Sequence, residues 1–292
     1  MVFPLARHKY DQESTLLHEK SRRESYMAKK ARGRNVVLAG VAVVSVIIGA
    51  LINFAIDTPS AAWGASNSPA RQGLFYMNAI LIYVIPAIMG MLMFAKRREW
   101  LAQPGKYVET GRYSLFSPYA LTASAVVAAV AVVAGLPGPI NIDTVALVTA
   151  FAAVFFGPAV AFLATFVAFI LRYLLGLAPW VATPNITVAY ALMDGGIWAV
   201  SATLFWFIIR GFNLKGSVKT VATMIMAFVF MGIHFSGWVI VNYFTNNPLP
   251  AALGNMAWAI GPTGFVISSF VAQFMGTLIG AFYYDSRLVQ AK

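Results

Sequence analysis

The sequence predicts an all-α membrane protein that crosses the bilayer about eight times. Of its 292 residues, 60% are hydrophobic and only 11% are charged. Several apolar runs exceed the roughly 18 to 20 residues that a helix needs to cross a bilayer. Because lipid offers no hydrogen-bond partners, the backbone groups of these runs must be satisfied within helices.

Eight apolar segments are the candidate helices: 35–56, 73–95, 118–134, 142–156, 158–175, 186–209, 219–241 and 257–283. The first is too long for a signal-peptide core and is predicted to be retained. Gly157 and Pro158 alone separate the fourth from the fifth, which predicts a tight turn between antiparallel neighbours.

The polar stretches divide the chain into four parts. These are a basic cytoplasmic leader (1–34), an N-terminal pair of membrane helices (35–96), a cytoplasmic linker (97–116) and a six-helix membrane domain (117–292). The leader mixes acidic and basic residues, which is typical of a surface helix or a mobile tail.

The basic residues predict the orientation in the membrane. If the eight segments alternate from a cytoplasmic N-terminus, all of the 21 lysines and arginines except Arg71 and Arg172 fall on the cytoplasmic side, as short cytoplasmic loops require. Both termini are therefore predicted to be cytoplasmic in a multi-pass protein of the cell membrane. This topology explains the net charge of +11 better than a nucleic-acid partner does, so the lipid bilayer is the expected partner.

The composition argues against an enzyme. Cysteine is absent, and two of the three histidines, His8 and His18, lie in the leader, so a metal site is not expected. The chain carries no Walker-type phosphate loop and no recognisable arrangement of nucleophile, base and acid. We therefore expect no catalytic residues and no cofactor.

The third segment carries two stripes of small residues. Ala120, Ser124 and Ala128 recur at a spacing of four, and Ala125 and Ala129 repeat this spacing on an adjacent stripe. Small residues at this spacing let another helix approach closely in lipid. The contact could lie within this protein or with a partner. A stiff loop, Gly135 to Pro139, follows.

The stretches "ASAVVAAVA", "NIDTVALVTAFAAVFFGPAVAFLATF" and "GIHFSGW" resemble the substrate-binding S component of energy-coupling factor (ECF) vitamin transporters, over about residues 113–292. The resemblance implies a six-helix protein that captures a vitamin on the outer side. It implies a coupling transmembrane subunit that docks on Ala125 and Ala129, and two ATPase subunits as further partners. The N-terminal pair of helices departs from the family pattern.

Asp194 and His234 are the strongest substrate-binding candidates, because ionisable groups at membrane depth face protein or water. Asp194, in "ALMDGG", could bind a cationic ring or amine, or pair with Arg172 or His234. His234, Trp238 and Asn242 share one helix face, although a satisfied core histidine is the alternative. Further candidates from helix ends and outer loops are Asn141, Asp143, Arg172, Trp180, Asn185, Tyr243 and Asn255.

Plain structural roles compete with binding at several of these positions. Asn141 and Asp143 could cap a helix, Arg172 could extend to lipid headgroups, and Trp180 could anchor the chain at the membrane interface. The leading hypothesis is the substrate-capture subunit of an ATP-driven ECF importer for a vitamin or small metabolite, with a thiamine-like ligand as the first guess. The alternative is a membrane sensor or a structural subunit that transports no ligand.

Overall fold

The computed structural model describes residues 33–52, 69–95, 118–136, 144–177, 184–212, 214–245 and 265–290, and the regular structure in these ranges is helical. The linker 97–116 and all but the last two residues of the leader 1–34 lie outside the described ranges.

Each of the eight predicted segments contains a helix in the described part of the chain. The helices are Gly33–Ile52, α2 (Pro69–Asn78) continued by a π-helical turn η2 (Ala79–Val84) and α3 (Ile85–Ala95), α5 (Pro118–Ala134), α6 (Thr144–Phe156), α7 (Pro158–Leu174), α8 (Pro184–Gly211), α9 (Gly216–Thr245) and α11 (Phe265–Gln290).

Four of the described helical stretches are long and apolar enough to cross a membrane: Gly33–Ile52, Gln72–Met93, Thr187–Ile209 and Gly216–Gly237. In the other helices, the described apolar stretches are 10 to 17 residues long, for example Ser269–Tyr283 in α11. At 1.5 Å per residue, the 13-residue α6 is about 20 Å long, against a hydrocarbon thickness of about 30 Å. An all-helical chain with helices of membrane-spanning length is thus confirmed for these residues, while the number of eight spans stays a prediction.

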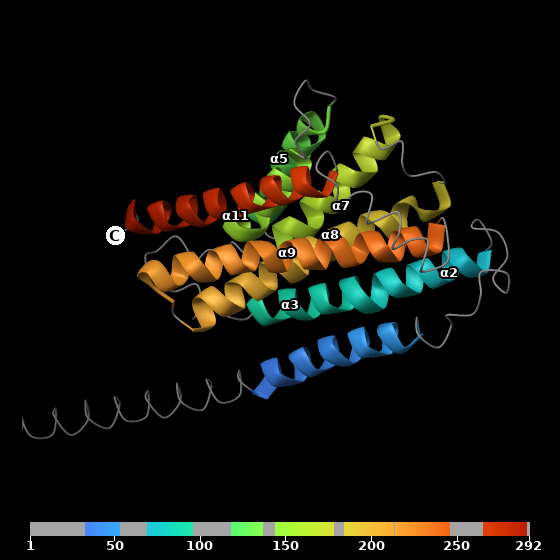
Figure 1. Ribbon diagram of the computed structural model, residues 1–292, viewed down its shortest axis with the longest axis horizontal. Helices are drawn as coiled ribbons and strands as arrows, with labels where there is room; N and C mark the ends of the chain where they lie inside the picture. The colour runs from blue at the N-terminus through green and yellow to red at the C-terminus, as the bar shows by residue number, and fades with distance from the viewer. Residues whose placement is uncertain are drawn as a thin grey trace, which may run out of the picture.

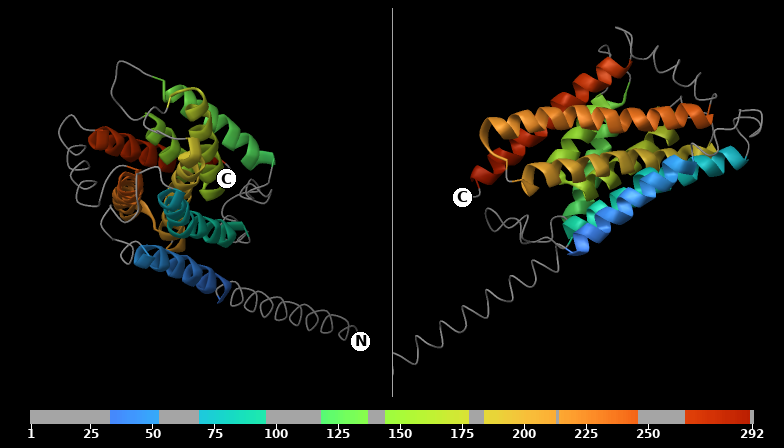
Figure 2. Two further views of the ribbon diagram at one scale, coloured as in Figure 1. Left: turned by 90° about the vertical axis from the view of Figure 1, so that its right-hand side faces the viewer. Right: turned by 60° about the horizontal axis from the view of Figure 1, so that its bottom comes forward.

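Helix α8 is the centre of the bundle. It packs against α9, against α7 and against the α2–η2–α3 helix. Figure 1 shows α8 and α9 side by side, with α2 and α3 on one side and α11 on the other, while α5 and α7 run at a steep angle to this row. The Gly33–Ile52 helix lies along the outer side of α2–η2–α3 (Figures 1 and 2), where Gly49 meets Leu81 and Ile82.

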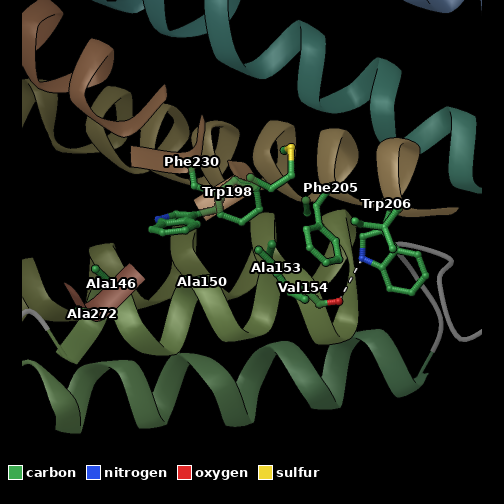
Figure 3. Close-up of a cluster of buried hydrophobic side chains, with 13 residues drawn as sticks. Ala146, Ala150, Ala153, Val154, Trp198, Phe205, Trp206, Phe230 and Ala272 are labelled. Atoms are coloured by element: carbon green, nitrogen blue, oxygen red, sulfur yellow. Dashed lines mark hydrogen bonds between the residues drawn. The ribbon is translucent and has the colours of Figure 1, made fainter. Parts of the chain in front are cut away.

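Two hydrophobic clusters hold α8 in place. In the first, Trp198, Phe205 and Trp206 of α8 pack on the alanines of α6 and on Phe230 of α9 (Figure 3). The Trp206 indole N–H donates to the carbonyl oxygen of Val154, at 3.1 Å, which satisfies the polar group of a buried aromatic residue.

The second cluster joins the N-terminal helices to the six-helix part. Phe75 and Tyr83, from α2 and η2, pack with Phe169 of α7 and with Tyr190 and Met193 of α8. Phe75 and Tyr83 are almost completely buried. The helix α2–η2–α3 therefore belongs to the same packed core as α7 and α8.

The turn between α6 and α7 confirms the sequence prediction. Gly157 has φ of 90°, and Pro158 occupies the first position of α7. Glycine adopts this conformation without the strain that a side chain brings, and proline is preorganised for the first helical turn.

Helices α6 and α11 approach closely through glycine. A Cβ atom on Gly276 would lie 2.3 Å from the carbonyl oxygen of Leu147, and one on Gly280 would lie 3.0 Å from that of Phe151. Two glycines four residues apart form one strip of a helix, which lets the backbones touch. This contact fixes α11 and therefore positions Gln273, one turn before Gly276.

Candidate functional site

Asp194 lies where three helical elements converge. The two residues that follow it in α8 are Gly195 and Gly196. A Cβ on Gly195 would lie 2.9 Å from the carbonyl oxygen of Phe162 in α7, and one on Gly196 would lie 2.7 Å from the Cβ of Tyr83 in η2. The paired glycines therefore let α7 and η2 close around α8 beside the carboxylate.

The structure brings two of the predicted site residues together. His234 Nε2 of α9 lies 3.9 Å from Asp194 Oδ1, and the two side chains are 15% and 21% exposed. This separation is too long for a direct hydrogen bond but short enough for electrostatic attraction. Of the two interhelical pairs considered for Asp194, the geometry provides the one with His234.

Gln273 of α11 fixes the other side of the imidazole ring. Its Nε2 donates to His234 Nδ1 at 2.9 Å and to the Ser269 hydroxyl oxygen at 3.1 Å. Since Nδ1 accepts a hydrogen bond, the proton of the neutral ring sits on Nε2, which faces Asp194. Asp194, His234, Ser269 and Gln273 form what we call the polar cluster.

An aromatic side chain borders the polar cluster. Trp198 lies one turn after Asp194 on the same face of α8 and is almost fully buried. Its ring centroid is 5.6 Å from that of His234, with the rings inclined by 64°. The cluster therefore combines a carboxylate, a fixed imidazole and an aromatic wall, a combination that suits a flat, positively charged group.

Tyr83 reaches the same region from the N-terminal helices. Its hydroxyl lies 2.8 Å from the Ser236 hydroxyl, which itself donates to the carbonyl oxygen of Ile233 at 2.6 Å. Because a serine hydroxyl has a single hydrogen, Tyr83 is the donor in this pair.

The π-helical turn η2 contains Tyr83. It ends with Ile85 donating its backbone N–H to Ile80, five residues earlier. Such turns insert an extra residue into a helix and are frequent at functional sites. Here the turn lies against Gly196, two residues after Asp194.

Arg172 lies in the last turn of α7, near the end of α5. A Cβ on Gly135 would lie 2.6 Å from its Nε atom. A cation at the carboxyl ends of two helices is stabilising. Asp194 is level with Phe162, and Arg172 follows Phe162 by ten residues, about 15 Å along a straight helix. Arg172 is thus placed apart from the polar cluster.

Eight other predicted site residues have no described side chain. Asn141, Asp143, Trp180 and Asn255 lie outside the described residues, as does most of the loop from Gly135 to Pro139. Asn185 lies in the first turn of α8, and Trp238, Asn242 and Tyr243 lie in the last two turns of α9, described as helix positions without their side chains.

The two small-residue stripes of α5 have different surroundings. Ala120 and Ala128 are buried, Ala120 against Val160 and Ala128 against Ala168 of α7. Ala125 and Ala129 are exposed on the surface of this chain. The first stripe therefore makes an internal helix contact, and the second is accessible to a partner or to lipid.

The sequence prediction missed Gln273, Ser269, Trp198 and Tyr83. A signal for the first two was present, because Ser269 and Gln273 are polar residues four apart in an apolar segment, which places them on one helix face. Trp198 likewise follows Asp194 by four residues.

Within the described residues, no group of three or more histidine, aspartate or glutamate side chains could hold a metal ion. A comparison of the chain with protein-family models, curated proteins and solved structures finds no match. The geometry of the polar cluster is therefore the main guide to function.

Proposed function

We propose that this protein is the substrate-capture subunit of an ECF-type importer for a vitamin or small metabolite, with a thiamine-like cation as the first candidate. The observation that carries the proposal is the Asp194 carboxylate, held 3.9 Å from His234 Nε2 between apolar helices. Keeping ionisable groups in such surroundings is costly, and binding a charged ligand is a common reason for it.

Each member of the site has a definite role in this proposal. Asp194 attracts the positive charge of the ligand, and the buried Trp198 ring supports His234 from the core side. The hydrogen bond from Gln273 to His234 Nδ1 favours one orientation of the imidazole ring. This preorganisation lowers the cost of ordering side chains when the ligand binds.

The proposal includes a topology of eight spans with both termini in the cytoplasm. Asp194, His234 and Gln273 each lie between 8 and 11 residues from the helix end that this topology puts outside, so they share one depth in the outer half. Helices α5 to α11 would form the S-component-like domain. The N-terminal helices would add Tyr83 to its binding region, a contribution that the family pattern lacks.

Partner subunits would supply the energy by hydrolysing ATP. The exposed stripe of Ala125 and Ala129 is the proposed docking face for a coupling transmembrane subunit, because small side chains permit close helix contact in lipid. The capture subunit would then reorient in the bilayer and present its ligand to the cytoplasm.

Copurification from native membranes tests this assignment. A tagged wild-type chain is expected to retain a coupling membrane protein and two ATPases, and the double variant Ala125→Leu, Ala129→Leu is expected to lose them while remaining folded. Ala39→Leu is the matched control, since Ala39 is an exposed alanine on the Gly33–Ile52 helix. A wild-type chain that never retains ATPases would refute the importer assignment and favour a structural subunit.

A further inference from the structure

Gln273 carries a buried hydrogen-bond acceptor that finds no partner in the described part of the chain. Its side chain is 1% exposed, and both N–H groups of its amide are used, one by His234 Nδ1 and one by Ser269. Among the residues that the structure describes, its Oε1 atom has no hydrogen-bond partner. Leaving a buried carbonyl oxygen unsatisfied is destabilising, so a protein that retains one has a reason to do so.

The Gln273 amide has two possible orientations, which differ by exchange of its oxygen and nitrogen atoms. The orientation in the structure is the more favourable one. Exchanging its oxygen and nitrogen would leave two N–H donors, instead of one oxygen, without acceptors. The oxygen and nitrogen share one carbon atom, and the nitrogen contacts His234. Oε1 therefore lies at the same junction as His234, and Asp194 lies across the ring.

We infer that the polar cluster binds a cation that carries N–H donors, with Gln273 Oε1 and the Asp194 carboxylate as its acceptors. This inference rests on the proposed capture function and names the ligand class more narrowly. Aminopyrimidinium, amidinium and guanidinium groups belong to this class. Quaternary ammonium ions do not, because they have no N–H group to offer Oε1.

The requirement for N–H donors comes from Gln273 Oε1 and not from the charge of the site. A cation could be attracted by Asp194 and Trp198 whatever its substituents, so charge alone does not select among cations. Oε1 adds selection, because a site built to hydrogen-bond a ligand rejects an analogue that leaves its polar group unpaired.

Two planar aromatic cations test the inference on the full chain in nanodiscs. Benzamidinium carries N–H donors, and N-methylpyridinium carries none. In titration calorimetry, benzamidinium should bind about tenfold or more tightly than N-methylpyridinium, as expected for one hydrogen bond to a charged group. Equal affinities, or no binding of either probe, would overturn the inference.

Variants locate the effect at Gln273. Gln273→Met removes the acceptor at similar volume and should weaken benzamidinium binding by about tenfold or more, with no loss for N-methylpyridinium. Thr277→Val is the matched control, because Thr277 is buried one turn away and its hydroxyl donates to the Gln273 backbone carbonyl. An equal loss in the two variants would contradict the role of Oε1. If Gln273→Met fails to fold, the comparison of probes on the wild type still decides.

The outcomes separate this inference from the proposed function. If ATPases copurify but the two probes bind equally, the importer assignment survives and the donor requirement fails. If benzamidinium binds selectively to a chain that never retains ATPases, the ligand class stands without the ECF partners.

Discussion

Replacing Gly276 by alanine tests the helix contact that positions Gln273. The new Cβ atom would lie 2.3 Å from the Leu147 carbonyl oxygen and 3.0 Å from the Ala150 Cβ. The nearest neighbour is a backbone atom, which cannot rotate away as a flexible side chain could. Helices α6 and α11 must therefore separate to accommodate one methyl group.

Two opposing contributions, helix propensity and overpacking, determine how much Gly276→Ala changes the free energy of unfolding. Alanine is favoured over glycine inside a helix by about 1 kcal/mol, whereas overpacking a close contact costs about 1 to 3 kcal/mol. Because the clash at Gly276 is with a backbone oxygen, we expect a cost near the upper end, and a net loss of stability of about 1 to 2 kcal/mol.

Gly232→Ala is the matched control. Gly232 lies in α9 and is exposed, and a Cβ atom added there would meet nothing within 4 Å. Only the gain in helix propensity from glycine to alanine therefore applies. The control should be more stable than the wild type by up to about 1 kcal/mol. The two variants should thus shift the melting temperature in opposite directions.

Thermal unfolding in detergent, followed by tryptophan fluorescence, measures the difference. Trp198 and Trp206 are both buried in the core and report its opening. Since Gln273 precedes Gly276 by less than one turn, benzamidinium binding should also weaken in Gly276→Ala. If Gly276→Ala is as stable as Gly232→Ala, α6 and α11 do not pack through this glycine.

Three further predictions concern other parts of the fold. Trp206→Phe removes the hydrogen bond to Val154 and should lower stability by about 1 kcal/mol or more, measured by thermal unfolding; an unchanged melting temperature would contradict this packing. Tyr83→Phe keeps the ring but loses the hydroxyl bond to α9, so we expect a loss of about 1 kcal/mol and faster exchange of α9 amides in hydrogen–deuterium exchange, and unaltered exchange would disprove the link. Because the chain contains no cysteine, single substitutions report topology: Ser66→Cys in intact cells should react with an impermeant thiol reagent and Ser217→Cys should not, whereas the reverse pattern would invert the proposed orientation.

Much of the helical framework could be predicted from the sequence, because it follows from local patterns. Uninterrupted apolar runs and the Gly157–Pro158 pair determine where helices form and where one turn reverses the chain. The predicted segment 219–241 fell short of α9, which begins at Gly216 and ends at Thr245. Polar residues such as Ser217 and Asn242 continue that helix although they interrupt its apolar pattern.

The candidate site was predictable only in part. Asp194 and His234 stand out because ionisable residues are rare in apolar segments, and the structure places them together. The hydrogen bond between Gln273 and His234 depends on how α9 and α11 pack, which no local sequence pattern indicates. The close contact of α6 and α11 had a signal in Gly276 and Gly280, but their partner helix could not be identified from spacing alone.

Native mass spectrometry of the chain released from membranes shows whether the polar cluster holds a ligand. One small cationic molecule with N–H donors is expected on each wild-type chain. It should be lost from Asp194→Asn, a variant that keeps the size of the side chain and removes its charge. A wild-type chain that carries no such molecule, or an Asp194→Asn variant that retains it fully, would contradict the assignment of the polar cluster as a ligand site.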